Sequence, residues 1–182
     1  MQTVRENILA IRNAEVVRDT VNDERVLATS TRSETRQIGW YDPLAQSFIV
    51  DEEGGIMITS VDLFFRTKDS NIPLSMQIRT MENGNPTKDI LPLSDITVNA
   101  ADVEISESAL IPTRFTFRSP VYIKQSVEYC FVLLSDSNEY QVWISRMGDV
   151  EKSGNRTISE QPYAGVLFKS QNASTWTADQ YE

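Results

Sequence analysis

Residues 56–66 read Ile56-Met57-Ile58-Thr59-Ser60-Val61-Asp62-Leu63-Phe64-Phe65-Arg66. In an extended chain, side chains two positions apart point to the same face, so Val61, Leu63 and Phe65 share one face. This period of two, in a run rich in β-branched and aromatic residues, predicts a β-strand. Turn residues bound the run at 51–55 and at 68–71, as is typical of a strand in an antiparallel sheet.

The same signal recurs from Trp40 to the end of the chain. Leu74, Met76 and Ile78 alternate in a second strand, and residues 82–86 predict a turn, because Asn-Gly tolerates positive φ. The further predicted strands cover residues 45–50, 95–98, 113–117, 122–123, 128–134, 140–145, 165–170 and 174–177. About eight to ten short strands without a strong helix predict an all-β fold, an antiparallel β-sandwich in preference to a closed barrel.

The first 39 residues differ from the rest. They contain six arginines balanced by six acidic residues and no aromatic side chain, whereas all 16 aromatic residues lie from Trp40 onward. Because aromatic side chains dominate core burial, we predict two parts, an arm at 1–39 and a β-sandwich domain at 40–182. The whole net charge of −9 lies in the second part.

The local structure of the arm stays open. A helix over about 4–18 is one prediction, followed by extended chain that pairs such as Val16-Val17 and the run Thr29-Ser30-Thr31 favour. The other is a tail that is disordered in the isolated chain and orders on assembly. We predict that its arginines contact neighbouring subunits, because the planar guanidinium binds carboxylates bidentately. They are Arg5, Arg12, Arg18, Arg25, Arg32 and Arg36.

Composition excludes several function classes. The chain of 182 residues has 17 basic and 26 acidic residues and no histidine. The acidic balance argues against general binding to nucleic acid or to an anionic membrane. The lack of histidine excludes Ser-His-Asp and Cys-His catalysis and His-ligated zinc. The sequence contains no apolar stretch of 18 residues, so no transmembrane helix is predicted. Cys130, the single cysteine, lies in an apolar run and is predicted to be a core residue. We expect no cofactor.

Acidic residues are the candidates for a metal or a hydrolase site. Asp51, Glu52 and Glu53 cluster in a predicted turn, as do Asp149 and Glu151, and calcium takes six to eight oxygen ligands. No EF-hand spacing is present, and a solvated acidic turn explains these residues without a metal. Two carboxylates would suffice for glycoside hydrolysis, but no pair in the sequence stands out from the others.

Aromatic residues near the end of the chain are the candidates for glycan contact. Trp176 and Tyr163 are the main ones, since sandwich lectins stack sugar rings on exposed aromatic faces. Trp143 and Tyr140 lie in a predicted strand, so core packing accounts for them equally well. We predict glycan contact at Trp176 and Tyr163 as an alternative to a purely structural role.

The entry to the sandwich carries a resemblance to a known group of proteins. Trp40-Tyr41-Asp42-Pro43-Leu44-Ala45-Gln46-Ser47-Phe48, with residues 58–65, resembles the large structural proteins of tailed bacteriophages, particularly contractile-tailed marine and cyanobacterial phages. The likeness covers about residues 38–170 and implies a jelly-roll-like module. Physically, Asp42 and Pro43 predict a turn, because Pro locks φ and Asp accepts backbone hydrogen bonds. Trp40 and Phe48 would flank this turn and anchor the arm.

The resemblance implies a virion protein of the tail, baseplate or fibre, made in the host cytoplasm. Its partners would be other virion structural proteins, in a homo-oligomer or ring, with no nucleic acid and no membrane. We therefore expect a non-enzymatic module that acts in assembly through protein–protein contacts. The alternatives are a carbohydrate-binding module that recognises a host-surface glycan and, after it, a glycan-degrading tail enzyme.

Overall fold

The computed structural model describes residues 40–150, 156–159 and 163–179. The predicted arm at 1–39, with its six arginines, lies outside these residues. The described chain consists of strands and one 3-10 helix, η3 (Ala100–Asp102). The strands are β2 (Leu44–Ile49), β3 (Ile56–Thr67), β4 (Leu74–Glu82), β5 (Asn85–Ile90), β6 (Ile96–Val98), β7 (Pro112–Ile123), β8 (Glu128–Ser135), β9 (Gln141–Val142), β10 (Leu167–Ser170) and β11 (Trp176–Ala178).

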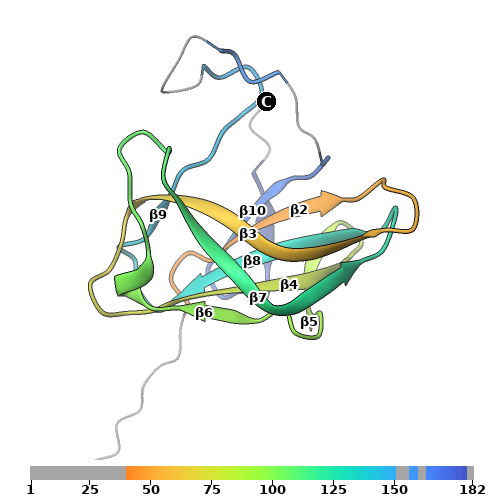
Figure 1. Cartoon of the computed structure of the whole chain (residues 1–182), viewed down its shortest axis with the longest axis horizontal. Helices are drawn as coiled ribbons and strands as arrows, with labels where there is room; N and C mark the ends of the chain where they lie inside the picture. The colour runs from red at the N-terminus through yellow and green to blue at the C-terminus, as the bar shows by residue number, and fades with distance from the viewer. Residues whose placement is uncertain (1–39, 151–155, 160–162, 180–182) are drawn as a thin grey trace, which may run out of the picture. The chain divides into compact units, whose positions relative to one another are not determined.

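The strands form two antiparallel sheets, and the smaller lies over the larger (Figure 1). The larger sheet has the order β11-β10-β2-β8-β4-β5, with β6 also paired to β4. The smaller sheet has the order β7-β3-β9. The predicted all-β antiparallel sandwich is confirmed. Within the described ranges, no helix is long and apolar enough to cross a membrane.

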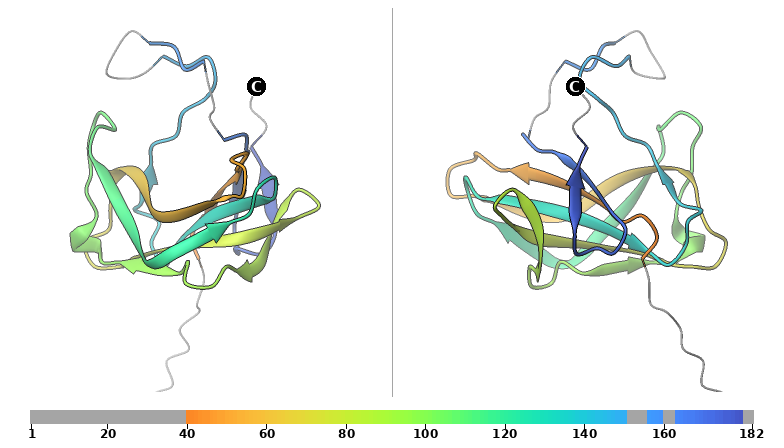
Figure 2. Two further views of the ribbon diagram at one scale, coloured as in Figure 1. Left: turned by 45° about the vertical axis from the view of Figure 1, so that its right-hand side comes forward. Right: turned by 180° about the vertical axis from the view of Figure 1, so that it is seen from behind.

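The connection between the sheets is that of a jelly roll. β2 pairs with β8 in the larger sheet, with Phe48 opposite Tyr129. The next strand in sequence after β2 is β3, and the one before β8 is β7. These two pair with each other in the smaller sheet, with Ile56 opposite Ile123. The segment β2–β3 and the antiparallel segment β7–β8 thus pass side by side from one sheet to the other, as Figure 2 shows in two views.

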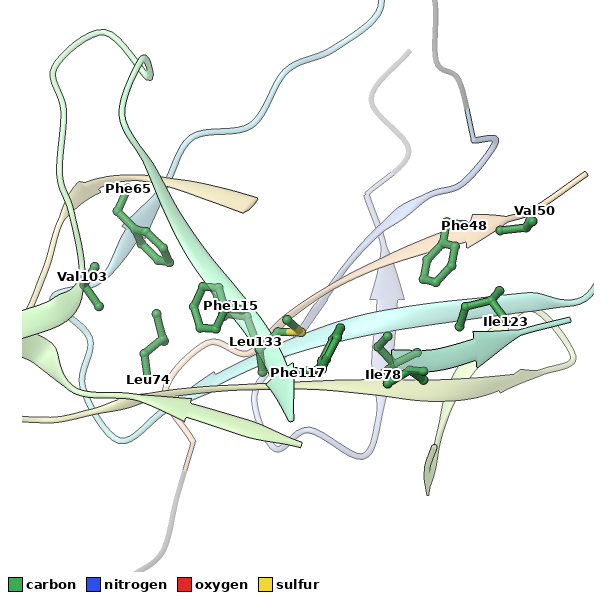
Figure 3. Packing of buried hydrophobic residues seen from close by; sticks show 12 residues of the cluster. Phe48, Val50, Phe65, Leu74, Ile78, Val103, Phe115, Phe117, Ile123 and Leu133 are labelled. Atoms are coloured by element: carbon green, nitrogen blue, oxygen red, sulfur yellow. The ribbon is translucent and has the colours of Figure 1, made fainter. Parts of the chain in front are cut away.

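The main core lies between the sheets. Leu74, Met76 and Ile78 of β4 are all buried, as their alternation predicts, and Phe65 of β3 is fully buried opposite them. Figure 3 shows Phe65 of the smaller sheet and Leu74 and Ile78 of the larger sheet pointing into the space between the sheets. The buried cluster is Phe48, Val50, Phe65, Leu74, Met76, Ile78, Val103, Phe115, Phe117, Val121, Ile123 and Leu133.

A second cluster covers the opposite face of the larger sheet. Cys130, Val132 and Leu134 of β8 point to this face, between the residues that point into the main core. Ala45, Phe168 and Ala173 complete the cluster, and Trp40, Met81, Trp176 and Ala178 pack against it. Both faces of β8 are therefore buried, which explains its nearly continuous apolar run.

β7 is one strand where the sequence predicted two, at 113–117 and 122–123. Ile58 of β3 pairs with Val121, but Ser60 pairs with Thr116, so the register shifts and leaves residues 117–120 against Thr59. Pro120 lies in this irregularity, which is where a strand tolerates a residue without an N–H. The alternation fails locally, but the chain stays extended.

Two other strands also differ from the sequence prediction. Asn83 and Gly84 take positive φ and make the predicted turn, but Asn85 and Pro86 already belong to β5, an edge strand in which Pro is tolerated. The strand predicted at 140–145 is only β9. The backbone N–H of Trp143 donates to the Phe64 carbonyl at 2.8 Å, and the chain then turns away from β3.

Replacing Trp40 by Ala is expected to destabilise the folded body, by which we mean the described residues from Trp40 onward. The ring is half-buried on the second cluster, so its loss should lower the free energy of unfolding by about 1–3 kcal/mol. Thermal unfolding of the full chain measures this, at about 2–4 °C of Tm per kcal/mol for a chain of this size. Tyr41→Ala is the matched control, because Tyr41 is 59% exposed. Equal Tm values for the wild type and Trp40→Ala would contradict this role.

Cys130 is expected to resist alkylation in the folded chain. Burial raises the pKa of its thiol from 9.0 to about 12, so almost no thiolate is present at pH 8. The folded thiol also holds its proton at a pH where the unfolded thiol has lost it. Its contribution to stability is therefore complete below pH 9 and lost as the pH rises towards 12.

Iodoacetamide labelling at pH 8, with and without urea, tests the resistance of Cys130. Urea unfolding of the wild type and of Cys130→Ala between pH 8 and 11 tests the dependence of stability on thiol ionisation. The free energy of unfolding of the wild type should fall more steeply with rising pH than that of the variant. Fast labelling without urea, or parallel pH profiles, would contradict the assignment.

Candidate functional site

Among the described residues, most of one edge of β3 has no partner strand. β7 pairs with β3 along one edge from Ile56 to Phe64. On the other edge β9 pairs only with residues 65–67, and the last hydrogen bond there reaches Phe64. In the described part of the chain, no strand pairs with this edge between Ile56 and Leu63. An unpaired edge presents a row of backbone N–H and C=O groups that can bind another extended chain.

An apolar cleft of about 920 Å³ opens beside this edge, between the two sheets. β3 contributes Ile56, Ile58, Val61 and Leu63, which are only half-buried although they pack on the main core. The facing wall comes from the larger sheet and includes Leu44, Phe48, Phe131 and Leu133. Phe48 and Phe131 pack against each other with ring centroids 6.1 Å apart.

The rim of the cleft exposes further apolar side chains. The segment after β9 contributes Trp143, Ile144 and Met147, and the segment before β10 contributes Val166. Ile144, Met147 and Val166 are 48%, 57% and 40% exposed. Large contiguous apolar surface is rare on proteins that work as monomers and marks an interaction site.

Ser47 holds one side of the cleft in place. It is fully buried in β2, its N–H donates to the Val166 carbonyl at 3.0 Å, and its hydroxyl accepts from the Val166 N–H at 2.9 Å. Gly165 lies so close to β2 that a Cβ there would be 1.8 Å from the Ser47 carbonyl oxygen. A glycine is therefore required at this contact.

The acidic turn before β3 contacts Tyr163, a residue that lines the cleft. The Tyr163 hydroxyl, from a ring that lines the cleft, donates to Glu52 Oε1 at 3.2 Å. The negative charge of Glu52 raises the pKa of Tyr163. Asp51, Glu52 and Glu53, the calcium candidates, are all exposed. Among the described residues, no group of three or more His, Cys, Asp or Glu side chains is placed to hold a metal.

The aromatic candidates for glycan contact do not form one cluster. Tyr163 and Trp143 line the cleft, whereas Trp176 packs half-buried on the second cluster. The indole N–H of Trp176 is buried and has no partner among the described residues, while that of Trp143 donates to the Ser106 carbonyl at 2.8 Å. Tyr140 packs on the main core and donates to the Ile72 carbonyl. Glycan contact at Trp176 and Tyr163 stays a prediction.

The entry motif occupies both faces of the larger sheet. Trp40 packs on the second cluster, whereas Phe48 points into the main core and lines the cleft. Asp42 takes positive φ of 42°, and Pro43 is buried, with its carbonyl accepting from the Ser170 N–H at 3.0 Å. The motif thus joins β2 to the strand β10. Its predicted role as anchor of the arm is untested.

Sequence analysis missed Arg79. The residue is 7% exposed, and its guanidinium donates to the Ala173 carbonyl at 3.1 Å and to Gln77 Oε1 at 2.8 Å. Burial lowers its pKa. Arg79 alternates with Ile78 and therefore points to the face opposite the main core. The sequence places Arg79 on a strand whose other face is apolar. That its own face is also covered is visible only in the structure, where the second cluster lies on that face.

Gly165→Ala is expected to open one side of the cleft. The added methyl group overlaps the backbone of Ser47, so residues 163–166 must move away from β2. We expect a loss of about 1–3 kcal/mol in the free energy of unfolding and faster hydrogen exchange at Val166. Gly84→Ala is the control, because nothing lies within 4 Å of a Cβ at Gly84 although its φ is +74°, so only backbone strain is added. Unchanged exchange at Val166 would contradict the contact.

No family model matches this chain, and no match is found among curated proteins or solved structures. The resemblance of residues 40–48 and 58–65 to structural proteins of tailed bacteriophages therefore stays a prediction.

Proposed function

We propose that this chain is a non-enzymatic structural module that assembles with a partner protein through the cleft. An extended apolar segment of the partner enters between the sheets and pairs with the free edge of β3. The observation that supports the proposal is the coincidence of two features at one place. No described strand pairs with the second edge of β3 over Ile56–Leu63, and an apolar cleft lies beside this edge.

Each feature supplies what the other lacks. Backbone hydrogen bonds to an added strand provide affinity, and pockets for alternate side chains provide specificity. Ile56 and Ile58 before the irregularity at Thr59, and Val61 and Leu63 after it, already line the cleft. A partner strand in register with β3 would extend this apolar wall, with its own apolar side chains directed inward and its polar side chains in water.

The dimensions suit a short strand. Eight residues of β3 span about 26 Å at roughly 3.3 Å per residue, which is longer than a typical strand of five or six residues. The cleft of about 920 Å³ has the volume of a specific binding pocket, which is about 300–1,000 Å³. Three or four inward apolar side chains of a partner strand would fit there.

The setting we propose is an assembled particle. The resemblance of the entry motif to tailed-phage proteins favours a virion tail, baseplate or fibre, where modules are held together by protein–protein contacts. The glycan-binding and glycan-degrading alternatives receive no further support from the positions of Trp176, Tyr163 or the acidic residues.

A labelled eight-residue peptide of alternating Val and Thr, flanked by Arg, tests the proposed function on the full chain. It should bind more tightly than a peptide of the same composition with its Val and Thr in two blocks. N-methylation of its backbone on the pairing edge should abolish binding, because it removes the N–H donors. Fluorescence anisotropy measures the three affinities.

A matched pair of variants locates the binding. Val61→Lys places an ammonium group on the apolar wall and should weaken binding of the alternating peptide at least about tenfold, or about 1.4 kcal/mol. Thr59→Lys places the same charge on an exposed position of the same strand and should leave binding unchanged. Equal binding of the alternating and block peptides, or equal affinity of the two variants, would refute the proposal.

A further inference from the structure

We infer that the strand which enters the cleft is Val26–Thr31, supplied by a second copy of this chain. This inference rests on the proposed function, since it names the partner for the same cleft. The segment belongs to residues 1–39, which precede the described body. It reads Val26-Leu27-Ala28-Thr29-Ser30-Thr31.

Within residues 1–39 this segment is the longest run without a charge. An apolar cleft disfavours an ionised side chain, because burial of an unpaired charge is expensive. The six residues match the length of a typical strand, and three of them, Val26, Thr29 and Thr31, are β-branched and favour extended chain. In extended chain, Val26 and Ala28 share one face and Leu27 and Thr29 share the other.

Negative charge in the turn before β3 complements the positive charge at the ends of the segment. Arg25 and Arg32 flank the uncharged run. Asp51, Glu52 and Glu53 are exposed in the turn that precedes β3, and Glu52 contacts the cleft residue Tyr163. A strand paired with β3 would carry an arginine past one end of the run towards this turn, where guanidinium–carboxylate pairs fix register and orientation.

The point at which the chain enters the body favours a second copy as the donor. Trp40 packs on the second cluster, on the face of the larger sheet opposite the cleft, and the Tyr41 N–H donates to the Ser135 carbonyl at 3.0 Å. If the donor were the same chain, residues 32–39 would have to lead from the cleft around the sheet to the face on which Trp40 packs. The cleft of a neighbouring copy imposes no such path.

The test uses light scattering of the full chain over a range of concentrations. The wild type should show a mass of at least twice 20.6 kDa. The double variant Val26→Asp with Leu27→Asp should show the monomer mass, because it places a charge on whichever face of the strand enters the cleft. Its Tm, measured alongside, checks that the body remains folded.

Ile8→Asp with Leu9→Asp is the matched control. It adds the same two charges to the other apolar run of residues 1–39 and should leave the oligomer intact. The alternating peptide should also bind the Val26/Leu27 variant more tightly than the wild type, by about tenfold if nine-tenths of the clefts are otherwise occupied.

The outcomes separate the inference from the proposed function. If the peptide binds but the Val26/Leu27 variant keeps the wild-type mass, the donor is another protein and the inference fails alone. A monomeric wild type whose cleft is freed by the variant overturns the second copy as donor. Absence of peptide binding to every variant would overturn the proposed function itself.

Discussion

The body of this protein depends on one strand, β8, being buried on both of its faces. β8 pairs with β2 on one side and with β4 on the other. Phe131 and Leu133 point into the main core, whereas Cys130, Val132 and Leu134 point into the second cluster. Because successive side chains of a strand alternate between its faces, one apolar run supplies both cores. Every element that covers either face, from η3 to β11, is held in place by this sheet.

The two sheets are unequal, and the cleft follows from this inequality. Counting described strands only, the larger sheet has seven and the smaller has three, one of which is β9 with two residues. The smaller sheet therefore covers the part of the larger sheet under β7 and β3 and leaves the inner faces of β2 and β8 partly open. The open area is apolar because it continues the main core. A strand added beside β3 would widen the smaller sheet so that it also covers the open inner faces of β2 and β8.

The parts of the fold that depend on local alternation were predictable. Leu74, Met76 and Ile78 share a face in the sequence and share the core in the structure. Prediction failed where a neighbouring strand decides the outcome. β7 continues through Pro120 because β3 accommodates the irregularity opposite Thr59. β9 ends early because the chain leaves the β3 edge after Trp143. Nothing in the sequence marked Arg79 as buried, but its guanidinium donates to the carbonyl of Ala173, in a loop that covers it.

The sequence by itself determined that the described residues from Trp40 onward are all-β and where most of their strands lie, because a period of two and turn residues are local properties. It also determined that Cys130 is a core residue, since the surrounding run is apolar on both faces. Only the tertiary structure decided which edges are paired, because strand pairing joins residues far apart in the chain. The free edge of β3, the cleft beside it and the contact of Gly165 with Ser47 are consequences of that pairing. They have no signature in any single stretch of the sequence.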